Sequence, residues 1–445
     1  MRCPTLKDLP PPLKGKSGWP WTEETRPPVA VGSDDIRLPR VTVVTPSYNQ
    51  GGFIEETIRS VLLQGYPNLE YIVIDGGSTD QSVEIIRKYE KWLAHWVSEK
   101  DEGQTHAINK GFTHSAGEIC AYLNSDDVYL PNALRDVAAF FHKNSDTGMA
   151  YGDCQIIDES SRINDSWIAP EFNLLELVFR CYIAQPAAFW RNSTAASVGN
   201  FNTEMHYAFD YQMWLRVAAA RFKLSHVPLM LAQHRKTEGT KTVSQPEEFT
   251  AEIVGGLKTF FGSPSLPAAL KSIESDAYAI VFLNHSLLNF RRQSIEEARR
   301  ALEFAFSHSP DLVARQRERV IRAIVANADP SGPIDDAREY MERLFAQLPD
   351  SARGLEQIRA RVLRRVEILH ASRSQDLQSV RRAWKLLLPI LIDDAMWLRN
   401  DAARSEILKL LIGQSGIRRL AGFKRLLAEA RGSIPRDEEN LRLSR

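Results

Sequence analysis

Four short stretches of the sequence gather carboxylates and small polar residues, at positions 45–52, 75–80, 99–103 and 124–127. The last reads Asn-Ser-Asp-Asp, and its adjacent carboxylates, Asp126 and Asp127, would repel each other unless a cation lay between them. Oxygen ligands on a loop are what Mg²⁺ and Mn²⁺ prefer, and such an ion can neutralise a phosphate-bearing ligand. The sequence therefore predicts a divalent metal site at Asp126 and Asp127.

Each polar stretch directly follows a run of residues with the pattern of a buried strand. We predict these strands at 41–45, 69–75, 95–98 and 119–123, with helical spacing at Ile54 to Leu62 and again across 105–112. Alternating strands and helices predict a parallel sheet with helices on both faces. Because ligands bind beyond the carboxyl ends of the strands in such sheets, the four polar stretches should meet at one edge.

The rest of the chain shows two changes of pattern. Residues 1–39 are rich in proline and carry Gly-Trp-Pro-Trp, which predicts an extended arm anchored on the next domain by its tryptophans. Strand signals continue at 148–152 and 187–190 and stop near Phe249. We predict a domain at 40–262 and an α-helical region at 263–445. The helical stretches of that region, which can include helical-hairpin repeats, are 277–290, 294–306, 311–327, 335–347, 352–373, 376–399 and 403–430.

Taken together, the polar stretches resemble the motifs of a known family. Thr45-Pro-Ser-Tyr-Asn, Asp75-Gly-Gly-Ser-Thr-Asp, Gly103-Gln with Ala107-Ile-Asn-Lys-Gly, and Asn124-Ser-Asp-Asp look like the successive motifs of family-2 inverting glycosyltransferases. The resemblance covers about residues 40–240. It implies an α/β fold class, with a GT-A type nucleotide-diphospho-sugar transferase domain, a mainly parallel sheet and a helical C-terminal region. The Pro-rich arm is similar to that of some bacterial members, which implies cell-envelope or exopolysaccharide synthesis.

The resemblance also implies roles for individual residues in binding a nucleoside-diphosphate sugar. Asp75 would accept a hydrogen bond from the nucleobase, Gly76 would allow close approach of the backbone, and Asp126 would face the ribose. The remaining donor-site candidates are Pro46, Ser47, Tyr48, Asp101, Asn109, Lys110 and Ser125. The alternatives are an ordinary turn aspartate at Asp75 and a surface or carboxylate-paired lysine at Lys110.

The metal and the general base complete the expected site. Asp127 and Asp126 would bind Mg²⁺ or Mn²⁺ beside the leaving diphosphate, and His234 could complete the metal shell. An inverting transfer needs one general base for the acceptor hydroxyl, and Asp210, at the start of a helix predicted at 210–220, is the candidate. The alternatives are purely structural roles: helix capping by Asp126 and Asp127 or by Asp210, and a loop histidine at His234.

Composition excludes some classes of protein and limits the partners. The 445 residues carry 56 basic and 56 acidic side chains, so the net charge of zero argues against a nucleic-acid binder. The sequence contains no run of eighteen apolar residues, so no membrane-spanning helix is predicted. Peripheral membrane contact and oligomerisation through the helical region stay open. Four scattered cysteines indicate reduced thiols and a cytoplasmic protein. The acceptor could be a glycan, a lipid-linked molecule or a protein.

Two alternative functions follow from the same pattern. A sugar nucleotidyltransferase would need basic side chains in the first loop to bind a triphosphate, and residues 45–52 contain none. A non-catalytic scaffold built on this fold would be favoured if Asp126, Asp127 or Asp210 were missing, and all three are present. A dinucleotide-dependent dehydrogenase is excluded because no GxGxxG follows the first strand.

Overall fold

A computed structural model describes residues 3–25, 38–237, 245–264, 266–328 and 333–373. The chain divides into two compact units, residues 1–281 and residues 282–445, and each is considered by itself. Within the described residues, no helix is long and apolar enough to cross a lipid bilayer. The predicted helices at 376–399 and 403–430 lie outside the described residues.

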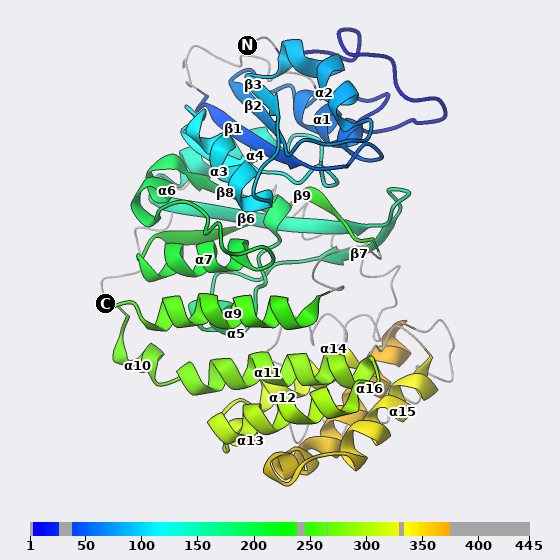
Figure 1. Cartoon of the computed structure of the whole chain (residues 1–445), viewed down its shortest axis with the longest axis vertical. Coiled ribbons are helices and arrows are strands. Elements are labelled where there is room, and N and C mark those ends of the chain that lie inside the picture. The colour runs from blue at the N-terminus through cyan, green and yellow to red at the C-terminus, as the bar shows by residue number, and fades with distance from the viewer. Residues whose placement is uncertain (1–2, 26–37, 238–244, 265, 329–332, 374–445) are drawn as a thin grey trace, which may run out of the picture. The chain divides into compact units, whose positions relative to one another are not determined.

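The first unit is built on a nine-stranded sheet with the order β3-β2-β1-β4-β8-β6-β9-β5, and β7 pairs with β6 (Figure 1). The strands are β1 (Val41–Ser47), β2 (Leu69–Asp75), β3 (His95–Ser98), β4 (Ile119–Tyr122), β5 (Val128–Tyr129), β6 (Thr147–Ile157), β7 (Ile163–Trp167), β8 (Ala188–Arg191) and β9 (Lys223–Arg235). The first four strands to appear lie where the sequence predicted them.

The sheet is parallel in its first half and mixed in its second. β3, β2, β1 and β4 pair in parallel, whereas β8 runs antiparallel to both β4 and β6. β9 lies parallel to β6, and β5 and β7 add antiparallel pairs. The predicted α/β class with a helical C-terminal region is confirmed. The mixed half could not be predicted, because antiparallel edges depend on pairing between distant segments.

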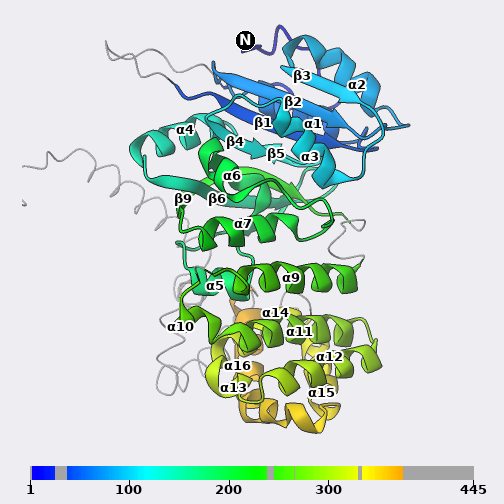
Figure 2. The same ribbon diagram turned by 60° about the vertical axis from the view of Figure 1, so that its left-hand side comes forward.

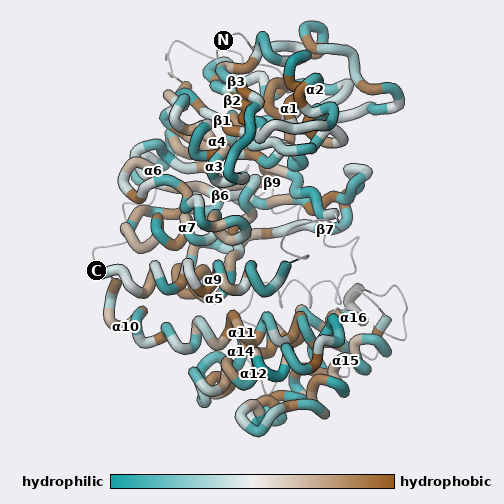
Figure 3. Tube along the Cα trace, in the orientation of Figure 1, coloured by the Kyte–Doolittle hydropathy of each residue, from teal (hydrophilic) through white to brown (hydrophobic). Residues whose placement is uncertain are grey.

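Helices cover both faces of this sheet (Figure 2). One buried cluster joins alternate residues of β1 and β2 to the apolar sides of three helices, α1 (Ile54–Leu62), α2 (Ser82–Tyr89) and α4 (Ala133–Lys143). On the other face, Trp214 of α7 (Phe209–Ala219) lies against Trp190 of β8, with ring centroids 5.8 Å apart. The brown segments in Figure 3 follow these buried strands and helix sides. Apolar burial on both faces stabilises the sheet and fixes its polar edge.

Helix α3 (Gln104–Thr113) lies unusually close to the sheet. A Cβ atom added at Gly111 would clash with the side chain of Val44 in β1. Only glycine permits this approach, which brings the N-terminus of α3 to the carboxyl edge of the sheet. The same helix then serves as a side wall for the residues that follow β1 and β2.

The proline-rich arm is tied to α1 by a buried arginine. Arg59 is fully buried and donates hydrogen bonds to the backbone oxygens of Pro10, Pro20 and Trp21, at 2.9, 3.1 and 3.0 Å. The Nε1 of Trp19 also donates to the backbone oxygen of Tyr129, at 2.8 Å. A buried guanidinium needs such acceptors, because an unpaired buried charge is costly. The described part of the arm is therefore held on the sheet domain.

The second unit is helical throughout its described residues. Helix α9 (Pro246–Phe261) and the short α10 (Ala268–Lys271) belong to the first unit, and the boundary between units falls inside α11 (Glu274–Arg291). The following elements are α12 (Ile295–His308), α13 (Leu312–Arg315), α14 (Arg317–Asn327), α15 (Ile334–Ala346), the 3-10 helix η3 (Asp350–Ile358) and α16 (Arg359–Arg373). The described helices agree with the predicted ranges, while the predicted domain boundary at residue 262 stays a prediction.

The start of α2 and the end of β9 are set by contacts with other segments. The N-cap of α2 is Gln81, and Asp80 accepts hydrogen bonds from the backbone nitrogens of Ser82 and Gly51, at 2.9 and 2.8 Å. His234 and Arg235 lie within β9 and do not follow it. The strand is longer than its local pattern suggests, since pairing with β6 continues to Arg235.

Candidate active site

Three strand ends meet at the same level of the sheet edge. Ser47 of β1 lies opposite Asp75 of β2, and Asp75 lies opposite Ser98 of β3. The hydroxyl of Ser98 donates to Asp75 Oδ2 at 2.7 Å. The parallel register therefore assembles the first polar stretches as the sequence predicted.

Asp75 is fully buried and organises its own loop. Its Oδ2 accepts hydrogen bonds from the backbone nitrogens of Gly77 and Ser78, at 3.1 and 2.8 Å, and its Oδ1 accepts from the Ser78 hydroxyl at 2.6 Å. These are the contacts of a turn-forming aspartate. Oδ1 accepts one described hydrogen bond, and a carboxylate oxygen has room for two.

Gly76 and Asp101 lie side by side behind this turn. A Cβ atom added at Gly76 would come within 2.8 Å of Asp101 Oδ2. The other oxygen of Asp101 accepts from the backbone nitrogen of Gly103 at 2.9 Å. A side chain at position 76 would thus displace the Asp101 carboxylate, so the glycine keeps both backbones close.

The end of β1 offers one buried and one exposed group. Pro46 and Ser47 are buried, and the Ser47 hydroxyl has no hydrogen-bond partner among the described residues. Tyr48 is 61% exposed, an unusual position for an aromatic side chain. A buried hydroxyl without a partner and an open ring are features of a surface that a ligand completes.

Asn109 and Lys110 on α3 already have partners in the protein. Asn109 Nδ2 donates to the backbone oxygen of Phe201 at 2.8 Å, and its Oδ1 accepts from the nitrogen of Phe201 at 3.1 Å. Lys110 pairs with Glu99, and this contact lowers the pKa of the Glu99 carboxyl. Asn109 thus holds the loop before α7, and Lys110 takes the carboxylate-paired alternative.

Asp127 is buried and joins two strands. Its Oδ1 accepts from the backbone nitrogen of Arg235 at 2.9 Å and lies 3.1 Å from Nδ1 of His234. Burial lowers the pKa of His234, but the charge of Asp127 and this contact outweigh it, and the net pKa is raised. With Nδ1 facing Asp127, the Nε2 atom is left to face a ligand.

Asp126 contrasts with its neighbour. Its side chain is half-buried and takes no hydrogen bond from another described residue. Burial and the charge of Asp127 raise its pKa to about 7, against the opposing effect of His234. Two carboxyl groups held this close favour binding of a cation, since a cation removes their repulsion.

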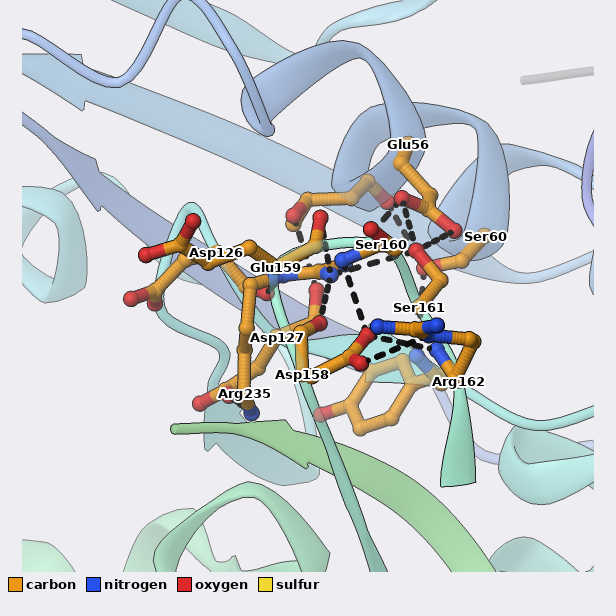
Figure 4. Close-up of polar contacts among 12 residues, drawn as sticks. Glu56, Ser60, Asp126, Asp127, Asp158, Glu159, Ser160, Ser161, Arg162 and Arg235 are labelled. Atoms are coloured by element: carbon orange, nitrogen blue, oxygen red, sulfur yellow. Dashed lines mark hydrogen bonds and ion pairs between the residues drawn. The ribbon is translucent and has the colours of Figure 1, made fainter. Parts of the chain in front are cut away.

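A buried arginine holds the Asp126–Asp127 loop in place (Figure 4). Arg235 Nε donates to the backbone oxygen of Asp126 at 2.8 Å, and its Nη2 pairs with Glu56 Oε2 at 3.1 Å. Its Nη1 donates to the backbone oxygen of Asp158 at 2.7 Å and to the Ser161 hydroxyl at 3.1 Å. The guanidinium is completely buried, so it stabilises the loop and is not placed to contact a diphosphate.

A chain of amides links the loop to both neighbouring segments. Gln104 Nε2 donates to Asn124 Oδ1 at 2.7 Å, and Asn124 Nδ2 donates to Gln185 Oε1 at 3.2 Å. Gln185 Nε2 in turn donates to the backbone oxygen of Tyr122 at 2.8 Å. The neighbouring Ser125 is buried. These contacts fix the loop between α3 and β8.

Asp210 opens helix α7 and lies within electrostatic range of His234. Its Oδ1 accepts from the backbone nitrogen of Tyr211 at 2.7 Å. Burial raises the pKa of Asp210 to about 6, while the charge of His234 lowers it. A carboxylate with a pKa near 6 suits a general base at neutral pH.

The metal site predicted at Asp126, Asp127 and His234 stays a prediction. In the described ranges, no group of three or more His, Cys, Asp or Glu side chains is arranged to hold a metal ion. Of the three predicted ligands, Asp127 already accepts a hydrogen bond from the backbone nitrogen of Arg235. The free carboxylate of Asp126 fits a Mg²⁺ or Mn²⁺ ion that takes its other ligands from phosphate and water.

Several supporting residues were not found from the sequence. Glu56 is one acidic residue in the first turn of a helix, and Glu252 of α9 is one of several in its first two turns. No local sequence pattern marks either residue as part of the site, because each contacts a segment that is far away in the chain.

Comparison with known proteins finds a family match over the first part of this site. Residues 42–187 match the model of Glycosyl transferase family 2. An uncharacterized glycosyltransferase of Rickettsia typhi is 28% identical over 239 residues, which are 49% of this chain and 72% of the relative. One from Rickettsia felis is 28% identical over 48% of this chain and 37% of its own length. An uncharacterized glycosyltransferase of Mycobacterium tuberculosis is 28% identical over 40% of this chain and 69% of its own length.

Solved structures resemble the chain more distantly. Staphylococcus aureus TarS in complex with UDP-GlcNAc has a TM-score of 0.48 at 20% identity, over 72% of this chain and 92% of that chain. A mannosyltransferase from Pyrobaculum calidifontis, in complex with GDP-Man and Mn²⁺, has a TM-score of 0.46 at 19% identity, over 77% and 90% of the two chains. Residues 42–187 are therefore similar to the family-2 glycosyltransferase domain, and the relatives that match this part of the chain are named as glycosyltransferases.

Proposed function

We propose that this chain transfers a sugar from a nucleoside-diphosphate sugar to an acceptor hydroxyl, with inversion at the anomeric carbon and with the help of Mg²⁺ or Mn²⁺. The observation that carries the proposal is the position of His234, which lies 3.1 Å from Asp127 Oδ1 and whose charge opposes the rise that burial causes in the pKa of both Asp126 and Asp210. Uncharacterized glycosyltransferases among the relatives support transfer in general, and the donor class is our inference.

The donor would lie along the carboxyl edge of β1, β2 and β4. The free lone pair of Asp75 can accept from a base N–H, and the open ring of Tyr48 can stack on a base. The hydroxyl of Ser47 can find its missing partner on the ribose. Because position 76 is a glycine, the Asp101 carboxylate can lie close to its backbone on this side of the proposed donor site.

The chemical step would use the opposite side of the site. Asp210 takes the proton of the acceptor hydroxyl while the acceptor oxygen forms a bond to the anomeric carbon. The bond from that carbon to the phosphate oxygen breaks, and its electron pair leaves with the nucleoside diphosphate. A divalent ion bound at Asp126, with His234 as a further ligand, would supply the charge that stabilises the leaving diphosphate.

A binding assay and one variant test the proposal. Thermal unfolding is measured with UDP, GDP and dTDP, each with and without Mn²⁺, because a ligand that binds only the native state raises the midpoint. We expect one nucleotide to stabilise the protein only in the presence of the ion. Asp210→Asn should then keep this stabilisation and lose release of the nucleotide from the matching UDP-GlcNAc or GDP-mannose. Transfer at the wild-type rate by this variant would refute the assignment of the base.

The acceptor class and compartment are also proposals. A glycan, a lipid-linked molecule or a protein can each supply the hydroxyl, and the four cysteines, all free, support a reducing compartment such as the cytoplasm. Neither the scaffold nor the nucleotidyltransferase alternative is favoured by an observation on this chain.

A further inference from the structure

The segment that leads into α7 is held by a carboxylate from another helix. Glu252 of α9 accepts hydrogen bonds from three consecutive backbone nitrogens, His206 at 2.6 Å, Tyr207 at 2.7 Å and Ala208 at 2.8 Å. Ala208 is the N-cap of α7, and its side chain cannot satisfy these donors. An ionised acceptor makes such hydrogen bonds stronger than neutral ones.

The same segment is fixed from its other side by α3. The hydroxyl of Thr105 donates to the backbone oxygen of Met205 at 3.1 Å, and Asn109 binds both backbone groups of Phe201. Helices α7 and α9 also pack closely, since a Cβ atom at Gly256 would lie 3.5 Å from the Cβ of Gln212. The loop before Asp210 is therefore held by α3, which lies within the family match, and by α9, which lies beyond it.

Asp210 is the second residue of α7, two positions after the last amide that Glu252 binds. The direction of its carboxylate depends on where the first turn of the helix begins. Nothing else among the described residues binds the amides of His206 and Tyr207. Without Glu252, these donors would need water, and the start of α7 could shift.

We infer that Glu252 is a positioning residue for the general base Asp210, and that α9, which lies outside the family match at 42–187, completes the acceptor side of the site. The inference rests on the proposed function. A displacement of about 1 Å at a catalytic group can cost on the order of 100-fold in rate. We therefore expect Glu252→Ala to lower kcat by about 10- to 100-fold without loss of nucleotide affinity.

The test uses the full chain, Mn²⁺ and whichever of UDP-GlcNAc or GDP-mannose it turns over, with release of the nucleotide as readout. Glu252→Ala should lower kcat, leave the Kd of the nucleotide within about twofold and leave KM for the donor nearly unchanged. Glu252→Gln, which keeps one oxygen acceptor, should recover part of kcat. Glu248→Gln is the matched control, because Glu248 is exposed on the same helix.

The outcomes separate this inference from the function on which it rests. An unchanged kcat in Glu252→Ala, or equal losses of nucleotide affinity and kcat, would overturn the positioning role. Adding Glu252→Gln to Asp210→Asn should cause no further loss, and an additive loss would also overturn it. If Asp210→Asn itself is fully active, the proposed function fails, whatever Glu252 does. If Glu252→Ala does not fold, the same comparisons use Glu252→Gln.

Discussion

Replacement of Arg235 by methionine should destabilise the first unit strongly. The guanidinium has no exposed surface, and its partner Glu56 is 8% exposed. Arg235→Met leaves the Glu56 carboxylate buried and without its cation. Removing one partner of a buried ion pair costs about 3–5 kcal/mol. The lost hydrogen bonds to the backbone oxygens of Asp126 and Asp158 belong to the same network, so they do not add a separate amount.

A neighbouring arginine provides the matched control. Arg162 pairs with Asp158 at 2.8 Å, but its side chain is 79% exposed. An exposed ion pair contributes about 0–1 kcal/mol, so Arg162→Met should leave the free energy of unfolding nearly unchanged. The two variants remove the same charge from residues that contact the same turn, and they differ in burial.

Urea unfolding followed by tryptophan fluorescence measures the difference. Seven of the nine tryptophans lie in residues 1–281, so the signal reports mainly on this unit. The double variant Arg235→Met, Glu56→Leu should recover part of the loss, because it leaves no unpaired buried charge. If Arg235→Met unfolds within about 1 kcal/mol of the wild type, or if the double variant is less stable than the single one, the buried-pair reasoning is refuted.

Further results are expected for Asp126, Asp210 and Lys110. Asp126→Asn should weaken Mn²⁺-dependent binding of UDP or GDP at least about tenfold in calorimetry and leave ion-independent binding unchanged, because it removes the free carboxylate. The raised pKa of Asp210, about 6, predicts that kcat falls as the pH drops through 6. Because the folded state binds this proton more tightly than the unfolded state, ionised Asp210 destabilises the fold. Asp210→Asn should therefore raise the midpoint of thermal unfolding at pH 8 and leave it unchanged at pH 3. Lys110→Met should keep nucleotide affinity within about twofold, since Lys110 pairs with Glu99, and a tenfold loss would show that it contacts phosphate.

Much of the site was accessible from sequence because its residues follow strands directly. A buried strand such as β2 has a local pattern, and the residue after it must lie at the sheet edge. The positions of Asp75, Asp101 and Asp126 at one edge followed from that rule. The adjacency of Asp126 and Asp127 also pointed to a cation without any knowledge of their surroundings.

The different environments of Asp126 and Asp127 were decided by tertiary structure. Asp127 turns inward because β9 brings the amide of Arg235 to it, from more than a hundred residues away. Asp126 keeps a free carboxylate because its loop is held through its backbone by the same arginine. No local pattern distinguishes the members of an Asp-Asp pair.

The sequence by itself determined the α/β class, the order of the first strands and the polar edge, since hydrophobic periodicity and strand ends are local properties of the chain. Only the tertiary structure decided which polar side chains form hydrogen bonds or ion pairs within the protein and which can still bind a ligand. Asn109, Lys110 and Arg235 all find protein partners that lie elsewhere in the chain, whereas the Ser47 hydroxyl has none among the described residues. Hydrogen bonding and burial depend on segments that meet only after folding, and they set the charge and freedom of each side chain.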